Sequence, residues 1–142
     1  CLVGKTFYES SGAMHFLLRM LGAIKVDRFS FDMDFFYECM DALQKGQTLL
    51  IFPEGKFSVD GTMSEFHDTA ALLALQAGVP VVPVYHGYDY KFFHRTPVVI
   101  GKPIDLAAEC PTQNPSPEEL RRLTKLLRDR IIELRAMAEE TA

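Results

Sequence analysis

The chain has 142 residues, 48% of them hydrophobic, which is enough for one globular α/β domain with a single core. Its formal net charge of -4 argues against a general nucleic-acid binder. No apolar run reaches the roughly 18 residues that span a bilayer. The three cysteines are widely spaced and odd in number, which predicts ordinary thiols in a reducing compartment and neither a disulfide framework nor a metal site.

The first part of the chain predicts a strand, a helix and a second strand. Cys1–Tyr8 is interpreted as a short strand and turn, and Gly12–Leu21 as a short helix that is apolar on nearly every side. We expect this helix in the core; a face against an acyl chain or a membrane is the alternative. Ala23–Val26 is predicted to be a strand followed by Arg28, and the carboxyl end of a strand is where ligands bind in open α/β sheets. A surface ion pair explains Arg28 equally well.

The middle of the chain predicts a helix, followed by the stretch TLLIFPEG, on which the predicted site depends. Asp32 can cap a helix that stops at Lys45 and Gly46. The apolar run Thr48–Phe52 then enters a proline, a carboxylate and a glycine, which is typical of a buried strand ending in a shaped polar loop. We expect this strand to bring Glu54 and its neighbours to a site.

A second helix and strand follow the loop. Strong helix formers predict a helix from about Glu65 to Ala77, with Gly78 as its stop. The next strand is expected over Val79–Tyr85, and its two prolines predict that it begins late or lies partly at an edge. Strand, helix and strand together indicate a right-handed βαβ unit.

The last part of the chain predicts a loop, a short strand, a connection and a long helix. Pro97–Ile100 is the expected strand, and the prolines of 107–117 indicate a linker. Ser116 is a cap for a helix whose first residue is Pro117. Its apolar stripe consists of Leu120, Leu123, Leu127, Ile131, Leu134 and Ala138. Because basic and acidic residues alternate on the rest of this helix, we expect a solvated face and not an anionic-lipid anchor.

These elements predict an α/β fold with a small, mostly parallel sheet flanked by helices. We divide the chain into a core over 1–106, a proline-containing connection over 107–117 and a C-terminal amphipathic helix over 118–142 that packs on the core. The sequence opens on Cys1 within what already looks like structure, so we expect the core to be incomplete at its N-terminal end.

Three blocks of the sequence carry a family resemblance. GAIKVDR (22–28), FPEG (52–55) and ALQAGVPVVPVY (74–85) stand in the order and approximate spacing of blocks in the glycerolipid acyltransferases, whose best-known members make phosphatidic acid from lysophosphatidic acid. The chain resembles this family from Cys1 to about residue 106. The resemblance implies that Arg28 contacts the acceptor's phosphate and that Pro53, Glu54 and Gly55 help to bind the acyl acceptor. It also implies that VPVVPV supports the acyl-donor side.

One departure from the family pattern concerns the acceptor. The family commonly continues FPEGTRS, whereas here Lys56 follows the glycine and Phe57 stands in place of the arginine. Lys56 can supply a charge, although only as a point donor without the guanidinium fork. The segment Phe66–Thr69 also lacks the family's usual basic and glycine residues. Acyl transfer is therefore better supported than a glycerol-phosphate acceptor.

The family's catalytic base, a histidine in an HX4D motif, has no counterpart in this sequence. The residues five positions after the four histidines are Met20, Leu72, Lys91 and Val99. His67 and Asp68 are the nearest substitute, but adjacent helical residues point in different directions. We expect the His/Asp pair upstream of Cys1, and we expect this chain alone to be inactive.

The predicted function is the transfer of a fatty acyl group from acyl-CoA or acyl carrier protein to a hydroxyl of a lysophospholipid or related acceptor in phospholipid synthesis. The expected acceptor-binding residues are Arg28, Pro53, Glu54, Gly55 and Lys56, with no metal and no cofactor beyond the acyl co-substrate. We expect the full protein to work at the cytoplasmic side of a membrane, without nucleic acid; its oligomeric state is open. One alternative is a non-catalytic acyl-chain or lipid-binding module on the same fold. Another is an unrelated α/β domain in which FPEG is only a buried strand and turn.

Overall fold

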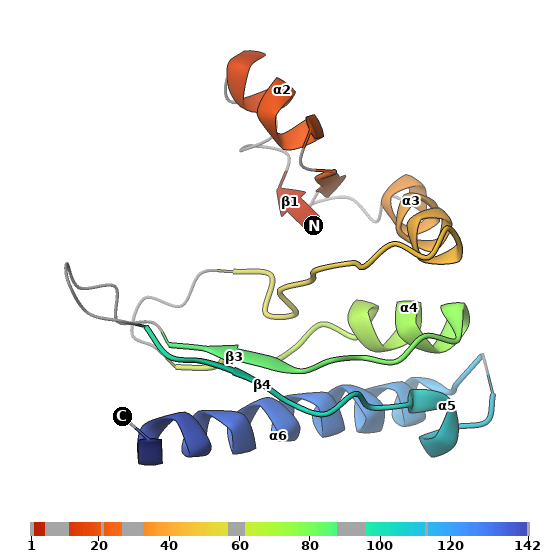
Figure 1. Cartoon of the computed structure of the whole chain (residues 1–142). Helices are drawn as coiled ribbons and strands as arrows, with labels where there is room; N and C mark the ends of the chain where they lie inside the picture. Colours follow the sequence, from red (N-terminus) through yellow and green to blue (C-terminus); the bar gives the residue numbers. More distant parts are fainter. Residues whose placement is uncertain are drawn as a thin grey trace. The chain divides into compact units, whose positions relative to one another are not determined.

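The chain forms two compact units, Cys1–Phe52 and Pro53–Ala142, which are described in turn. The computed structural model (Figure 1) describes residues 2–4, 12–20, 22–26, 33–56, 62–87, 96–112 and 114–141. Both units contain helices and paired strands, so the predicted α/β class is confirmed. None of the described helices combines the length and the apolar character that crossing a bilayer requires.

The first unit is built on a parallel pair of strands. Its elements are β1 (Leu2–Gly4), α2 (Gly12–Met20), β2 (Ile24–Val26) and α3 (Met33–Gln44). Leu2 lies opposite Ile24 and Gly4 opposite Val26, and α2 lies between the two strands in the sequence, as a parallel pair requires. The three elements expected before Arg28 are thus confirmed.

Three apolar side chains of α2 contradict its expected place in the core. Phe16, Leu17 and Met20 are exposed, although Ala23, which follows the helix, is buried. A helix that is apolar on nearly every side has more apolar surface than one packing face can cover, so part of it stays exposed.

Helix α3 agrees with its prediction. It ends at Gln44, and Gly46 then adopts a positive φ of 74°, which glycine tolerates at a helix C-terminus. Asp32, its expected cap, lies outside the described residues. Cys39 on this helix is a buried free thiol, and burial together with the nearby Glu38 raises its pKa to about 11. This thiol therefore stays protonated at neutral pH.

The predicted strand Thr48–Phe52 is wrong. These residues belong to neither of the sheets in the described part of the chain, so the βαβ unit expected around them does not form either. Burial alternates along the run, with Leu49 and Ile51 half-buried and Leu50 and Phe52 exposed. The apolar run thus favours an extended backbone, but a strand also needs a partner backbone, which a local pattern does not specify.

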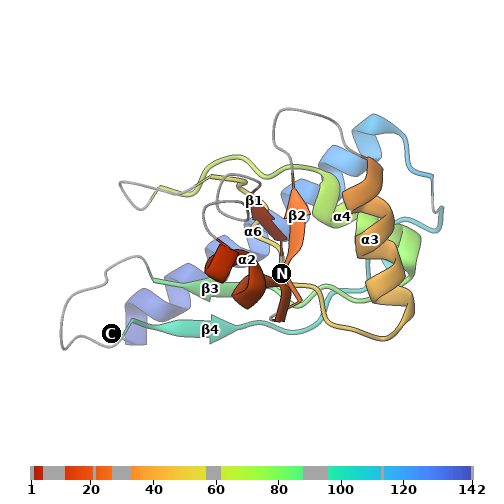
Figure 2. The same ribbon diagram turned by 90° about the horizontal axis from the view of Figure 1, so that it is seen from above.

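The second unit contains an antiparallel pair of strands. Its elements are α4 (Thr69–Ala77), β3 (Val84–His86), β4 (Val98–Ile100), α5 (Leu106–Glu109) and α6 (Pro117–Thr141). Tyr85 lies opposite Val99, and both are half-buried while their neighbours along each strand are exposed. Because α6 contacts both strands and runs beside them (Figures 1 and 2), we infer that it covers this half-buried face.

The prediction that proline would delay the second strand is confirmed. Only Val84 and Tyr85 of the expected Val79–Tyr85 belong to β3. Before it, Val81 forms a single antiparallel bridge with Ile104, with N–O distances of 2.9 and 2.8 Å in the two directions. The predicted strand at Pro97–Ile100 is also confirmed, as β4.

Helix α4 begins later than predicted. The expected start was Glu65, but α4 spans Thr69–Ala77 because the backbone before it is committed elsewhere. The Ser64 amide donates to a Glu54 side-chain oxygen and the His67 amide donates to the Pro53 carbonyl. The predicted stop is confirmed, since Gly78 adopts a left-handed φ of 64°.

The expected connection over 107–117 includes most of a short helix, α5, which was not predicted from the sequence. Asp105 caps α5, and its Oδ1 accepts a hydrogen bond from the Ala107 amide at 3.0 Å. The aspartate followed by Leu-Ala-Ala-Glu is a helix-start pattern that the prolines further along obscured.

Helix α6 closes the core of the second unit. It begins at Pro117 as predicted, with a reciprocal capping box: the Glu119 amide donates to Ser116 Oγ and the Ser116 amide to Glu119 Oε2. The buried core cluster consists of Ala71, Ala74, Leu75, Leu106, Cys110, Leu123 and Leu127. The first part of the predicted apolar stripe, Leu120, Leu123 and Leu127, therefore packs in the cluster with α4 and α5.

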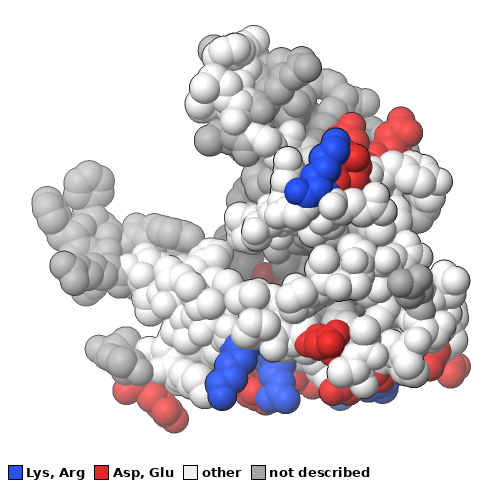
Figure 3. Space-filling view, turned by 45° about the vertical axis from the view of Figure 1, so that its right-hand side comes forward, with Lys and Arg blue, Asp and Glu red and all other residues white. Residues whose placement is uncertain are grey.

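The opposite side of α6 carries mixed charges. On the face drawn in Figure 3, Lys and Arg side chains alternate with Asp and Glu along the lower edge, where α6 lies. Exposed ion pairs join Arg130 to Glu133 and Arg122 to Glu109. The expected solvated face is confirmed for these residues, whereas Arg128 and Arg135 on the same helix are half-buried and are described with the site below.

Candidate functional site

The predicted acceptor-binding loop, Pro53–Lys56, is a turn in the second unit. Gly55 has a positive φ of 62°, a conformation that favours glycine. Arg28, the other predicted acceptor ligand, lies outside the described residues, so its place beside this loop stays a prediction. The structure thus brings together four of the five predicted residues, which are consecutive in the sequence.

Two hydrogen bonds tie this loop to Thr62–Asp68, which we call the 62–68 segment. The half-buried Glu54 accepts a hydrogen bond on Oε2 from the Ser64 amide at 2.7 Å. The Pro53 carbonyl accepts one from the His67 amide at 2.8 Å. A carboxylate that accepts from a backbone amide forms a short, charge-assisted hydrogen bond. Glu54 therefore shapes the loop, and one of its oxygens is already occupied.

Gly55 lies directly against the imidazole of His67. A Cβ added at Gly55 would stand 3.0 Å from both Cδ2 and Nε2 of that ring. Position 55 thus favours glycine because of its positive φ, and a side chain added there would also have to displace the ring of His67. The contact places an exposed histidine at the predicted acceptor site, which sequence reasoning did not foresee.

Lys56 places a positive charge at the end of the loop. Its side chain is exposed. Phe57, which stands where the family has arginine, lies outside the described residues. The expectation that His67 and Asp68 do not form a dyad agrees with the structure, because the Asp68 carboxylate accepts a hydrogen bond from the Thr124 hydroxyl at 2.7 Å.

Helix α6 supplies two polar side chains that hold the 62–68 segment. Thr124 binds Asp68, and the guanidinium of the half-buried Arg128 donates to the carbonyls of Met63 and Ser64 at 3.1 and 3.2 Å. Sequence reasoning missed both and assigned Arg128 to the solvated face. Their signal was present, since the two stand four residues apart and adjoin the apolar stripe at Leu123 and Leu127.

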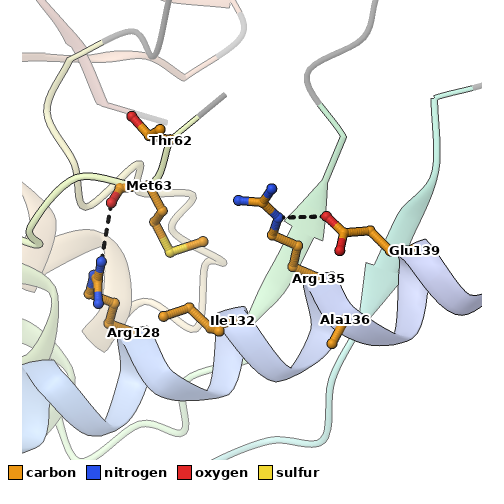
Figure 4. A pocket seen from close by; sticks show the side chains of 7 residues that line it. All are labelled: Thr62, Met63, Arg128, Ile132, Arg135, Ala136 and Glu139. Carbon is orange, nitrogen blue, oxygen red and sulfur yellow. Dashed lines mark hydrogen bonds and ion pairs between the residues drawn. The ribbon is translucent and has the colours of Figure 1, made fainter. Parts of the chain in front are cut away.

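A shallow groove of about 350 Å³ opens beside Arg128 (Figure 4). Met63, Ile132 and Ala136 give it an apolar floor, and Arg135, paired with Glu139, lies at the end away from Arg128. Thr62 completes its lining. The four predicted residues of the loop do not line this groove, so it is distinct from the predicted acceptor site.

The loop combines three chemical features. It contains a carboxylate fixed by a hydrogen bond, a glycine packed against the His67 ring and an exposed ammonium group. Pro53–Lys56 contains no histidine, serine or cysteine, and its carboxylate already accepts a hydrogen bond from the Ser64 amide.

Comparisons with known proteins indicate the family of the chain. The family model described as Acyltransferase matches residues 1–87, which include the loop and the 62–68 segment. The chain is 35% identical over 69 residues to the chloroplastic 1-acyl-sn-glycerol-3-phosphate acyltransferase of Brassica napus, a match covering 47% of this chain and 20% of that protein. It is 44% identical over 46 residues to the 1-acyl-sn-glycerol-3-phosphate acyltransferase of Pseudomonas aeruginosa, covering 32% of this chain and 18% of the relative.

A solved structure shares the fold. The 1-acyl-sn-glycerophosphate (LPA) acyltransferase PlsC from Thermotoga maritima superposes with a TM-score of 0.66 and 24% sequence identity. The match covers 95% of this chain and 56% of that one. The chain therefore spans little more than half of the solved neighbour and about a fifth of the curated relatives.

Proposed function

Because the chain belongs to the acyltransferase family, we propose that it takes part in phospholipid synthesis by moving a fatty acyl group to a hydroxyl of a lysophospholipid or related acceptor. The observation that carries this proposal is the loop Pro53–Lys56, held in a defined shape inside the stretch that matches the family. The names of the relatives, all 1-acyl-sn-glycerol-3-phosphate acyltransferases, support this acceptor class.

In the proposed reaction the chain's own residues hold the acceptor. Lys56 and Arg28 attract its anionic group, and Arg28 adds the paired donors that suit a phosphate. Glu54 keeps the loop in shape through Ser64, and Gly55 adopts the positive φ of the turn between Glu54 and Lys56. In this proposal Glu54 holds the loop through its hydrogen bond, and another residue takes the proton of the acceptor.

The chemical step joins the acceptor to the acyl group. The acceptor hydroxyl oxygen attacks the thioester carbonyl carbon, a base takes its proton, and the thiolate of coenzyme A or of the carrier protein leaves. We place the base in a His/Asp pair upstream of Cys1. Holding the two reactants together contributes much of the acceleration in such a transfer.

The site of action follows from the reactants. A lysophospholipid resides at a membrane surface and the acyl donor arrives from the aqueous side, so we place the full protein at the cytoplasmic face of a membrane. No metal or organic cofactor is required by the proposed step, in which the acyl thioester is the co-substrate.

The test is an acyl-transfer assay on the full-length native protein. Acyl-CoA and acyl carrier protein loaded with an acyl group are supplied in turn as the donor, with lysophosphatidic acid in detergent micelles as the acceptor. The assay measures both the acylated lipid and the free thiol that are released. We expect equal amounts of both products. Lys56→Ala should raise the acceptor KM about tenfold, as the loss of one charged contact implies. Lys102→Ala, an exposed lysine on another loop, serves as the matched control.

Two outcomes would contradict the proposal. Binding of a labelled acyl ligand without turnover by the full-length protein would favour the lipid-binding module. Turnover that Lys56→Ala and Lys102→Ala affect equally would show that the loop does not hold the acceptor.

A further inference from the structure

Arg128 and Glu54 meet through a single peptide group. Arg128 Nη2 donates to the Met63 carbonyl at 3.1 Å (Figure 4), and the amide of the next residue, Ser64, donates to Glu54 Oε2 at 2.7 Å. The Met63 carbonyl and the Ser64 N–H belong to the same peptide unit. The described chain contains no cis peptide bond, so these two groups point in opposite directions.

The two charged partners polarise this peptide group in the same sense. A guanidinium on the carbonyl oxygen draws electron density toward that oxygen and makes the N–H a stronger donor, and the carboxylate is the strongest acceptor a side chain offers. Hydrogen bonds in such a chain strengthen one another where water is partly excluded. Arg128 and Glu54 are both half-buried, so the charges are less screened than on the open surface.

The fork of the guanidinium fixes the segment as well as polarising it. Arg128 Nε donates to the Ser64 carbonyl at 3.2 Å, which adds a second anchor on the adjacent peptide. Two donors in one rigid plane set the direction of the backbone between them, which a single lysine ammonium does not do. The Ser64 amide is therefore held at a fixed angle to Glu54.

We propose that Arg128 is a positioning residue for the acceptor loop, acting on Glu54 through the Met63–Ser64 peptide group. The proposal rests on the proposed function for its consequence in catalysis, but the coupling itself is a property of the folded chain. Arg128 lies on α6, outside the residues 1–87 that match the family model. A residue outside the stretch that matches the family model would thus position a side chain inside it.

The coupling is tested first by NMR on the 142-residue chain. A short hydrogen bond to a carboxylate moves an amide proton downfield, so the Ser64 amide should resonate at unusually low field. Arg128→Met, which keeps the stem and removes the donors, should shift it upfield. Arg128→Lys should restore part of the shift, and it also serves as the test variant if Arg128→Met does not fold. The control Arg121→Met, at an exposed position of the same helix, should leave the resonance in place.

The consequence for catalysis is tested with a double-mutant cycle on the full-length protein. Arg128→Met should lower kcat/KM for the acceptor about tenfold, the effect of losing one charged hydrogen bond. When Arg128→Met is added to Glu54→Gln, kcat/KM should fall by a further factor of less than three. Both variants break the same chain of hydrogen bonds, so the second change has little left to remove. A merely structural role for Arg128 would instead give losses that multiply, and that result would overturn the proposal.

The two tests separate this proposal from the proposed function. A Ser64 resonance that is the same in the wild-type chain and in both Arg128 variants would overturn the coupling, whatever the enzyme does. A protein that shows the NMR coupling but no acyl transfer would retain the coupling and refute the proposed function.

Discussion

Two regions of the second unit are held together in different ways. The core between α4, α5 and α6 is apolar, with Ala71, Leu106 and Leu123 almost completely buried. The acceptor loop and the 62–68 segment are instead joined by directed hydrogen bonds from Glu54, Thr124 and Arg128. The core is stabilised by apolar area that many side chains bury together, whereas the shape of the loop depends on a few individual hydrogen bonds.

The difference matters for function. A hydrogen bond weakens steeply when its donor turns away from its acceptor, so the loop keeps its shape only while each donor faces its acceptor. A binding site benefits from the second arrangement because its groups are already in place when the ligand arrives. Core variants should therefore change stability most, and loop variants should change acceptor binding more than their effect on stability suggests.

The largest effect on stability is expected in the core. Leu123 is 0% exposed, and Leu123→Ala should lower the free energy of unfolding by about 3 kcal/mol. The matched control is Ile132→Ala on the same helix, where the side chain is 39% exposed and the loss should stay below about 1 kcal/mol. Urea unfolding followed by circular dichroism measures both. Equal losses would show that the leucine cluster is not the core.

Gly55→Ala tests the tightest point of the loop. The positive φ costs about 1 kcal/mol for alanine, and the Cβ placed 3.0 Å from the His67 ring should bring the total to about 2 kcal/mol. Gly78→Ala is the control for backbone strain alone, since its φ is 64° and nothing lies within 4 Å of the added Cβ. Adding His67→Ala should reduce the cost of Gly55→Ala to that of the control. If the two glycine variants cost the same from the start, the ring contact is unimportant.

Thr124→Val removes the hydroxyl that binds Asp68 and keeps the shape of the side chain. Thr124 is 7% exposed and its partner is a carboxylate at 2.7 Å, so we expect a loss of about 1.5 kcal/mol. Thr124→Ser keeps the hydroxyl and should restore most of this. Acceptor KM should rise in the valine variant beyond what its stability explains. An unchanged KM would mean that the Asp68 end of the segment is not coupled to the loop.

The smallest effect is expected at the exposed start of α6, and it depends on pH. Hydrogen bonds from the Ser116 amide and hydroxyl hold the pKa of Glu119 below its ordinary value of 4.5. Because the folded-state pKa is the lower one, this stabilisation is complete above 4.5 and is lost as the pH falls through the folded-state pKa. Wild type should thus be more stable than Glu119→Gln at neutral pH, with the difference vanishing in acid. Thermal melts across this range would reveal a constant difference if the charge plays no part.

The contrast between the two regions also explains what the sequence could predict. The stripe of α6, its Ser116 cap and the glycine stops after α3 and α4 were all predictable, because each is set by residues a few positions apart. The bonds around the loop join residues 10, 64 and 56 positions apart, from Glu54 to Ser64, Ser64 to Arg128 and Asp68 to Thr124. No local pattern specifies such pairs.

The same reasoning accounts for the wrong strand. Thr48–Phe52 has the apolar composition of a strand, and only the position of a partner backbone could decide whether it pairs. The late start of α4 has a similar cause, because the amides of Ser64 and His67 are committed to Glu54 and Pro53. The loop residues themselves were predicted from the family resemblance, and their acceptor-binding roles stay predictions.

The most direct test of the hydrogen-bonded loop is amide hydrogen exchange at Ser64 and His67 in the 142-residue chain. Both amides lie outside helices and strands, yet each donates to an acceptor in the Pro53–Lys56 loop. We predict protection from exchange at both positions, weakened at Ser64 in Arg128→Met and unchanged in Arg121→Met. Exchange at both amides as fast as in an unstructured peptide would contradict the fixed loop and, with it, the proposed positioning of Glu54.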